Sequence, residues 1–124
     1  MTFDTQEMRF LAKVTLGGDV EPSRLSSQLG TTVTALAPTL GLSRDSVSKQ
    51  ARIYSSATQK RLREFVDIIV RTTPWAGSPI QAFAWYRAQS LPSFGDLTAE
   101  ELVKRGRADE VKDYLGRIAL GGFA

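Results

Sequence analysis

The chain has 124 residues, of which 42% are hydrophobic and 23% are charged, and its formal net charge is +3. This balance is typical of one globular domain or of two closely packed half-domains. Cysteine and histidine are absent, which excludes disulfides, thiol nucleophiles, Ser-His-Asp catalysis and most zinc sites. No apolar stretch reaches the roughly 18 residues of a membrane span, and the first residues lack a secretory signal. We therefore expect a cytoplasmic protein that is not an enzyme, with no catalytic residues, cofactor, bound metal or membrane partner.

The N-terminal part of the chain is predicted to contain two short helical segments. Residues 1–20 would form an arm or a short helix that ends at Gly17 and Gly18. A second helix is predicted over 22–29, because Pro22 suits a first helical turn and Gly30 suits the position after the last turn.

Residues 33–52 have the spacing of a helix-turn-helix motif. A helix over about 34–40 is predicted to end at Gly41, which would make the tight turn. Ser43 would then cap a second helix over about 44–54. This order of helix, glycine turn and capped helix is the one that DNA-binding proteins use to present a recognition helix.

The side chains of this motif have distinct physical roles. Ala37 is small where the second helix would cross the first most closely. Two residues depart from the pattern: Pro38 removes a hydrogen bond inside the first helix, and Gln50 stands where such motifs usually carry a large apolar residue. The apolar residues that would hold the two helices together are Leu36, Leu40, Leu42 and Val47.

Basic residues are concentrated in and after this motif. Between residues 44 and 63, six basic residues accompany one acidic residue, whereas the two kinds are equal in number from residue 72 onward. A charge cluster alone is most often a solvated face, but its coincidence with the motif favours salt-dependent DNA binding. Because one recognition helix buries little surface, we expect a homodimer on operator DNA. The predicted DNA-binding residues are Arg44, Ser46, Ser48, Lys49 and Arg52.

An amphipathic helix is predicted over 58–71, followed by a loop over 72–77 that contains proline, tryptophan and glycine. Trp75 in this loop would either cover the core or belong to a contact surface. Ser78 followed by Pro79 predicts the start of another helix, which continues through residue 86. The apolar stripe of the helix over 58–71 is formed by Leu62, Phe65, Val66 and Ile69.

Two further helices are predicted after a loop over 90–96. Thr98 and Glu101 form a capping box, in which the threonine caps the helix and the glutamate reaches back to the cap. This helix would end at Gly106, and the last helix would cover about 108–119. The apolar side of the last helix is formed by Val111, Tyr114, Leu115 and Ile118.

No segment shows the alternating pattern of a strand, so the predicted fold class is all-α. We expect a helix-turn-helix half that packs against a small C-terminal helical domain. The predicted boundaries are 1–20 for the N-terminal arm, 21–71 for the DNA-binding region and 72–124 for the C-terminal domain.

Residues 24–124 resemble the Xre/MbcA/ParS family of toxin-binding antitoxin domains. The best-matching part runs over 85–123, where Trp85, a polar loop and a leucine-rich helix follow one another in the family's order and spacing. Ala99 departs from the family, which typically has proline directly after the threonine. The other shared features are Gly106, Val111, Leu115-Gly116-Arg117-Ile118 and a C-terminal end of glycine and an aromatic residue.

This resemblance implies a function and a partner. Family members neutralise a RES-type toxin that consumes NAD by binding it directly, and many repress their own operon through the helix-turn-helix. The chain would then be the antitoxin of a type II toxin-antitoxin system, and NAD would belong to the toxin. A small apolar tail on a glycine hinge suits entry into the toxin's active site. The toxin-binding residues that the resemblance implies are Arg117, Gly121, Gly122, Phe123 and Ala124.

Two other functions remain open at this point. The chain could be a helix-turn-helix transcription regulator without a toxin partner, or a toxin-binding protein whose DNA-binding motif has decayed, as Pro38 and Gln50 suggest. Phe123 is open in the same way, since it either folds back onto the core or is held out for a partner. The residues that are most simply explained as core are Trp85, Leu102, Val111, Leu115 and Ile118.

Overall fold

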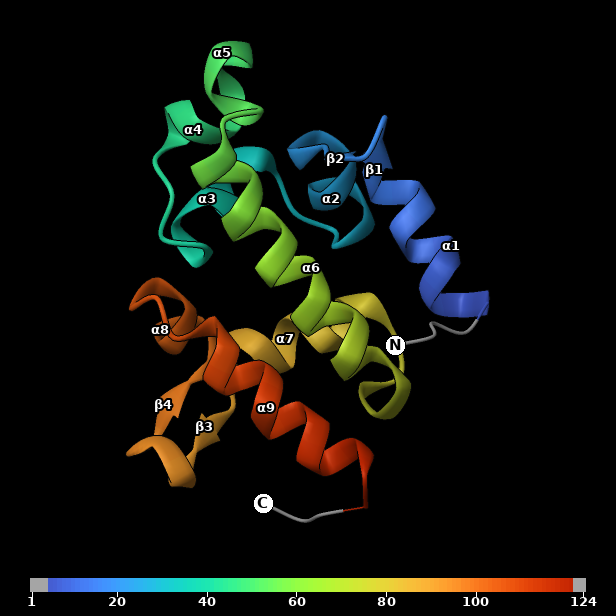
Figure 1. Cartoon of the computed structure of the whole chain (residues 1–124), viewed down its shortest axis with the longest axis vertical. Helices are drawn as coiled ribbons and strands as arrows, with labels where there is room; N and C mark the ends of the chain where they lie inside the picture. Colours follow the sequence, from blue (N-terminus) through green and yellow to red (C-terminus); the bar gives the residue numbers. More distant parts are fainter. Residues whose placement is uncertain (1–4, 122–124) are drawn as a thin grey trace.

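The computed structural model describes residues 5–121 (Figure 1). This part of the chain consists mainly of helices, and its few strands form very short antiparallel pairs. The molecule is mostly helical, as the sequence predicts. In chain order, the elements are α1 (Thr5–Val14), β1 (Thr15–Leu16), β2 (Asp19–Val20), α2 (Pro22–Gln28), α3 (Val33–Thr39), α4 (Arg44–Ser48), α5 (Gln50–Ile53), α6 (Ser56–Ala76), α7 (Pro79–Ala88), β3 (Ser90–Leu91), a 3-10 turn (Pro92–Phe94), β4 (Leu97–Thr98), α8 (Ala99–Lys104) and α9 (Ala108–Ala119).

The long helix α6 organises the core. In Figure 1 it runs through the middle of the molecule, with α1 and the β1–β2 hairpin on one side and α8 and α9 on the other. It packs along α7 and α9 and also contacts β2 and α1. Because neighbours cover it from several directions, its buried residues extend beyond the single predicted stripe. The buried apolar residues of α6 are Leu62, Phe65, Val66, Ile68, Ile69 and Val70.

The interpretation of residues 72–77 as a loop was wrong, because α6 continues through most of this segment. Pro74 lies in the last turn of the helix, where its missing N–H removes only one helical hydrogen bond. Thr72 and Thr73 are buried, and each donates its hydroxyl to the carbonyl four residues earlier at 2.7 Å. The extra turn is therefore stabilised by tertiary packing and by side-chain hydrogen bonds that the composition of the segment does not reveal.

The strand pairs are a second difference from the prediction, which contained no strands. β1 and β2 form a hairpin around Gly17 and Gly18, both of which have positive φ. Gln59 of α6 fastens this hairpin, because its side-chain carbonyl accepts the Val20 N–H at 2.9 Å and its NH2 group donates to the Val20 carbonyl at 3.0 Å. β3 and β4 form another antiparallel pair, so the segment over 90–96, which was predicted as a loop, begins with a short strand.

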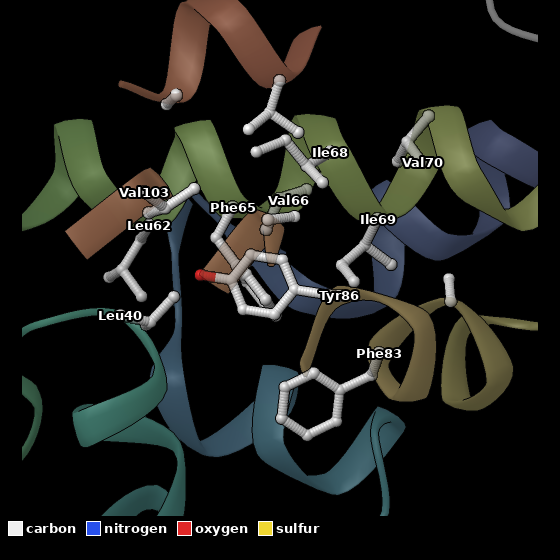
Figure 2. Packing of buried hydrophobic residues seen from close by; sticks show 14 of the residues in the cluster. Leu40, Leu62, Phe65, Val66, Ile68, Ile69, Val70, Phe83, Tyr86 and Val103 are labelled. Carbon is white, nitrogen blue, oxygen red and sulfur yellow. The ribbon is translucent and has the colours of Figure 1, made fainter. Parts of the chain in front are cut away.

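Aromatic side chains of α6 and α7 form the centre of the core (Figure 2). The rings of Phe65 and Tyr86 meet edge to face with their centroids 4.9 Å apart. The Phe83 ring also packs edge to face against Phe65. The Tyr86 hydroxyl is buried and donates to the Thr39 carbonyl at 2.7 Å, which ties α7 to α3. Burial raises the pKa of this hydroxyl, so it stays protonated and remains a donor. One continuous hydrophobic cluster therefore joins residues before and after position 72.

Three predicted helix starts are confirmed. Ser43 and Ser78 each accept the backbone N–H of the residue three positions later, at 3.1 Å. The capping box is complete, since Thr98 accepts the Glu101 N–H at 3.1 Å and the Glu101 carboxylate accepts the Thr98 N–H at 3.2 Å. These local signals were readable because every bond joins groups within one helical turn.

Some of the residues that the sequence assigns to the core are buried, and others are only half-buried. Leu102, Val111 and Leu115 are buried, whereas Trp85 and Ile118 are half-buried and pack against the edge of the cluster. Trp75 projects from the last turns of α6 and meets Trp85 edge to face at 5.2 Å between centroids. Trp75 nevertheless keeps 43% of its surface exposed.

No helix within residues 5–121 combines the length and the apolar character that a membrane span requires. Over the same part of the chain, no group of acidic side chains is arranged so that it could hold a metal ion. Buried polar side-chain atoms in this described region all have a hydrogen-bond partner, as expected for a well-packed core.

Candidate nucleic-acid interface

The helices α3 and α4 form a close pair joined by a tight turn over residues 40–43. Gly41 has a φ of 67°, a left-handed conformation that glycine adopts without strain. The N–H groups of Leu40 and Leu42 both donate to the Ala37 carbonyl, at 3.1 and 3.0 Å. Ala37 itself is fully buried, so a larger side chain at this position would separate the two helices.

The turn is also fastened to α6. The Arg61 guanidinium donates through Nη1 to the Leu40 carbonyl at 2.7 Å and lies 3.4 Å through Nε from the Glu64 carboxylate. Arg61 is half-buried, so this cation positions the α3–α4 turn and is less available to a ligand. Arg61 belongs to the basic cluster between residues 44 and 63. Its bond to the turn is not visible in the sequence, because the bond spans 21 positions of the chain.

The prediction of one continuous helix over about 44–54 was wrong. Lys49 has a ψ of 121°, an extended conformation that ends α4 and separates it from α5. Within α4 the Ser48 hydroxyl donates back to the Arg44 carbonyl at 2.6 Å, a local bond that weakens helical continuity. α5 has no buried residue, and Gln50 at its start is exposed. Position 50 therefore supplies no apolar side chain that could pack a continued helix against the core.

The residues predicted to bind DNA lie on α4, on α5 and at the break between them. Arg44 and Arg52 are exposed, and within residues 5–121 neither guanidinium has an ion pair or a side-chain hydrogen bond. Lys49 is exposed and lies 3.5 Å from the Asp45 carboxylate, a pair that water screens strongly. The predicted set is therefore divided between two short helices and the break between them, and all of its members except Ser46 are exposed.

The two predicted serines are less available than the basic residues. Ser46 is half-buried, and its hydroxyl lies 2.8 Å from that of Ser43 at the start of α4. Ser48 is exposed, but its hydroxyl proton is used within α4. These hydroxyls can still accept hydrogen bonds, whereas the strongest donors to phosphate or base edges on this surface are the two free guanidinium groups.

Two of the residues that the resemblance assigns to toxin binding, Arg117 and Gly121, lie at the C-terminal end of α9. Arg117 is exposed, and its guanidinium stands 5.9 Å from the centre of the Tyr114 ring. Gly121 is exposed and has a φ of 85°, a conformation that glycine adopts without strain. Leu120 exposes 90% of its surface, far more than a leucine that serves the core. Gly122, Phe123 and Ala124 lie outside the described residues.

Two pairs of side chains form hydrogen bonds on other parts of the surface. The hydrogen bond from Arg107 lowers the pKa of the Glu110 carboxyl and raises the pKa of the Arg107 guanidinium at the start of α9. The Tyr54 hydroxyl donates to the Glu21 carboxylate at 2.8 Å, and this bond raises the pKa of Tyr54. The Arg107–Glu110 pair lies within the first turn of α9, whereas the Tyr54–Glu21 bond joins the end of α5 to the start of α2.

Comparisons with known proteins found no matching protein-family model, no matching curated protein and no matching solved structure.

Proposed function

We propose that the chain is an antitoxin that binds operator DNA through α3, α4 and α5 and neutralises a RES-type toxin through its C-terminal end. The observation that carries the DNA-binding part is the position of Arg44 and Arg52, which are exposed after the α3–α4 turn without an ion pair among residues 5–121. A helix-turn-helix places such side chains against the major groove and its phosphates. Two copies of the chain would bind two half-sites of the operator.

The turn supports this proposal because it is rigid where DNA recognition needs rigidity. Gly41 closes the turn, Ala37 allows close crossing of the helices, and Arg61 ties the turn to α6. A recognition segment held in this way loses little conformational entropy when it binds, so more of the contact energy contributes to affinity.

The toxin-binding part rests on the resemblance of residues 24–124 to the antitoxin family and on the exposure of the α9 terminus. Leu120 offers an apolar side chain and Arg117 a cation on the same exposed end. An exposed leucine of this size beside a glycine with positive φ fits a segment that makes its contacts in a complex. No cofactor is required of this chain, because NAD is the substrate of the toxin.

DNA binding is tested by fluorescence anisotropy with a duplex taken from the region upstream of the chain's own reading frame. The variant Arg44→Ala/Arg52→Ala should bind at least about tenfold more weakly, and the slope of log K against log salt should fall by about two. The matched control is Arg9→Ala/Lys13→Ala, which removes the same charge from the exposed face of α1. Equal losses in both double variants would show a general charge effect and contradict the proposed surface.

Toxin binding is tested by growth rescue in cells that express the neighbouring reading frame. The full chain should restore growth, and a chain that ends at Leu120 should fail because it lacks the tail that would enter the toxin. If the neighbouring reading frame is harmless and no RES-type toxin is encoded nearby, the toxin partner is refuted and the regulator without a toxin remains.

The break at Lys49 favours a second candidate, a toxin-binding protein whose DNA-binding motif has decayed. α4 has only five residues and Lys49 is extended, so the recognition segment is shorter than the sequence predicts. This candidate predicts full growth rescue together with no salt-dependent binding to the upstream duplex. Binding with a steep salt slope would exclude it.

A further inference from the structure

A groove of about 370 Å³ lies beside the α3–α4 turn and reaches from Ser46 of α4 to the loop after α8. Three segments that are distant in sequence form its walls: the turn itself, the first turns of α6 and the loop between α8 and α9. Figure 1 shows the end of α8 directly beside the α3–α4 turn. The residues that line the groove include Gly41, Ser46, Lys60, Arg61 and Gly106.

Basic residues of α6 line this groove, and basic residues at and after the end of α8 neighbour it in the chain. Arg61 and Lys104 already have partners, since Arg61 pairs with Glu64 at 3.4 Å and Lys104 with Glu100 at 2.9 Å. Lys60 lines the groove, and Arg105 directly precedes Gly106 in its wall. Lys60 and Arg105 are exposed and have no ion pair among residues 5–121, so they provide two uncompensated positive charges.

The α8–α9 loop is held in a fixed position against the turn. A Cβ atom added at Gly41 would lie 3.3 Å from Lys104 Cγ and 3.4 Å from Lys104 Cα, so the end of α8 packs directly on the turn. Within the loop, Gly106 N–H donates to the Val103 carbonyl at 3.0 Å, and Arg107 N–H donates to the Leu102 carbonyl at 2.9 Å. Arg105 therefore projects from an ordered support and not from a free loop.

We infer that Lys60 and Arg105 form a second phosphate-binding surface that extends the DNA interface beyond the helix-turn-helix. This inference rests on the proposed DNA binding and names further residues for the same partner. In this arrangement α4 faces the base edges, while Lys60 and Arg105 neutralise backbone phosphates beside the site. The two unpaired cations beside the groove favour a polyanion as the ligand.

The C-terminal half of the chain is thereby part of the DNA interface. Residues of the α8–α9 loop lie in the region that the resemblance assigns to toxin binding, yet Lys104 contacts the turn that presents the recognition segment. Phosphate contacts from Arg105 would fix the angle at which α4 approaches the DNA without contributing base specificity.

The test measures anisotropy of the upstream duplex and of a scrambled duplex with Lys60→Ala/Arg105→Ala. Affinity at about 0.15 M salt should fall about tenfold on both duplexes, and the slope of log K against log salt should decrease by about two, because each lost phosphate contact removes about 0.9. The charge-conserving variant Lys60→Arg/Arg105→Lys should keep the wild-type slope. The matched control Arg9→Ala/Lys13→Ala should change the slope much less.

The outcomes separate this inference from the proposed function. If the wild-type chain binds neither duplex, the proposed DNA binding itself fails. If the wild type binds and Lys60→Ala/Arg105→Ala keeps its affinity and slope, the second phosphate surface is refuted while DNA binding stands. Loss of toxin rescue without a change in DNA affinity would assign these residues to the toxin and also overturn the inference. Circular dichroism of each variant verifies the fold, and an unfolded alanine variant leaves Lys60→Gln/Arg105→Gln as the same test.

Discussion

Two buried polar side chains, Gln59 and Tyr86, connect elements that are far apart in the sequence. Gln59 is 2% exposed and makes hydrogen bonds to Val20 and to the Ile53 carbonyl, the latter at 3.0 Å. Tyr86 is fully buried and bonds to Thr39 across 47 positions. Each side chain satisfies backbone groups that would otherwise lack a partner in the interior, so we expect both to contribute to stability far more than exposed polar residues.

Replacing Tyr86 by phenylalanine should destabilise the protein. The ring would keep its packing against Phe65, but the buried Thr39 carbonyl would lose its donor, which costs about 1–2 kcal/mol. The midpoint of urea unfolding, followed by circular dichroism, measures the change. Tyr54→Phe is the matched control, since its exposed hydroxyl bonds only to the Glu21 carboxylate. Equal effects of the two variants would contradict the role given to Tyr86.

Replacing Gln59 by methionine should have a larger effect. The volumes are similar, but the Val20 N–H and carbonyl and the Ile53 carbonyl would all lose the partner that Gln59 provides, for a cost of about 2–4 kcal/mol. Thermal unfolding gives the comparison, with Gln81→Met at an exposed position of α7 as the control. Wild-type stability in Gln59→Met would show that the hairpin does not depend on this side chain.

At the scale of the elements, the ends of helices decide where the chain changes direction. α6 ends at Gly77, which has a φ of 112° and donates its N–H to the Thr73 carbonyl at 2.9 Å. Gly116 has a different setting, since it lies inside α9 and no atom stands within 4 Å of the position that a Cβ would take. The same substitution should therefore have opposite effects at the two positions.

Gly77→Ala should destabilise the protein by about 1–2 kcal/mol, because an L residue is strained at this φ and the added methyl would contact the Gln81 side chain. Gly116→Ala should stabilise it by up to about 1 kcal/mol through higher helix propensity. Both changes are measured as shifts in the midpoint of urea unfolding. A stabilising Gly77→Ala would show that α6 ends differently from the structure described here.

At the scale of the whole molecule, α9 separates the two proposed binding surfaces. Arg105 and Gly106 precede the start of α9, whereas Leu120 and Gly121 follow its end. Twelve helical residues span about 18 Å at a rise of about 1.5 Å per residue. The two proposed surfaces therefore share no residue, and the two activities should be separable by mutation.

A chain that ends at Leu120 should keep its affinity for the upstream duplex within about twofold, because none of the basic residues at the groove or on α4 is removed. The same chain should fail to rescue growth against the toxin. Lys60→Ala/Arg105→Ala should show the reverse pattern, with rescue intact and DNA affinity reduced. Anisotropy and growth rescue on both variants provide the measurement, and a truncation that loses both activities would show that the two surfaces are coupled.

The features that the sequence by itself determined are those that depend on neighbouring residues. Helical periodicity identified the main helices, and capping residues located the starts at Ser43, Ser78 and Thr98. The turn at Gly41 was equally visible, because only a residue without a Cβ adopts that φ freely. The basic cluster after this turn is also a local pattern of the sequence, and the DNA-binding surface that it suggests stays a prediction.

The tertiary structure decided the features that depend on contacts between distant segments. Burial of Thr72 and Thr73 against the core extended α6 beyond the predicted end, and the lack of any buried residue in α5 accompanied the break at Lys49. The contact of Lys104 with the turn at Gly41 brought a second basic segment beside the α3–α4 turn. Periodicity and capping report interactions within about four residues, whereas these contacts join segments whose proximity is set only when the core closes around α6.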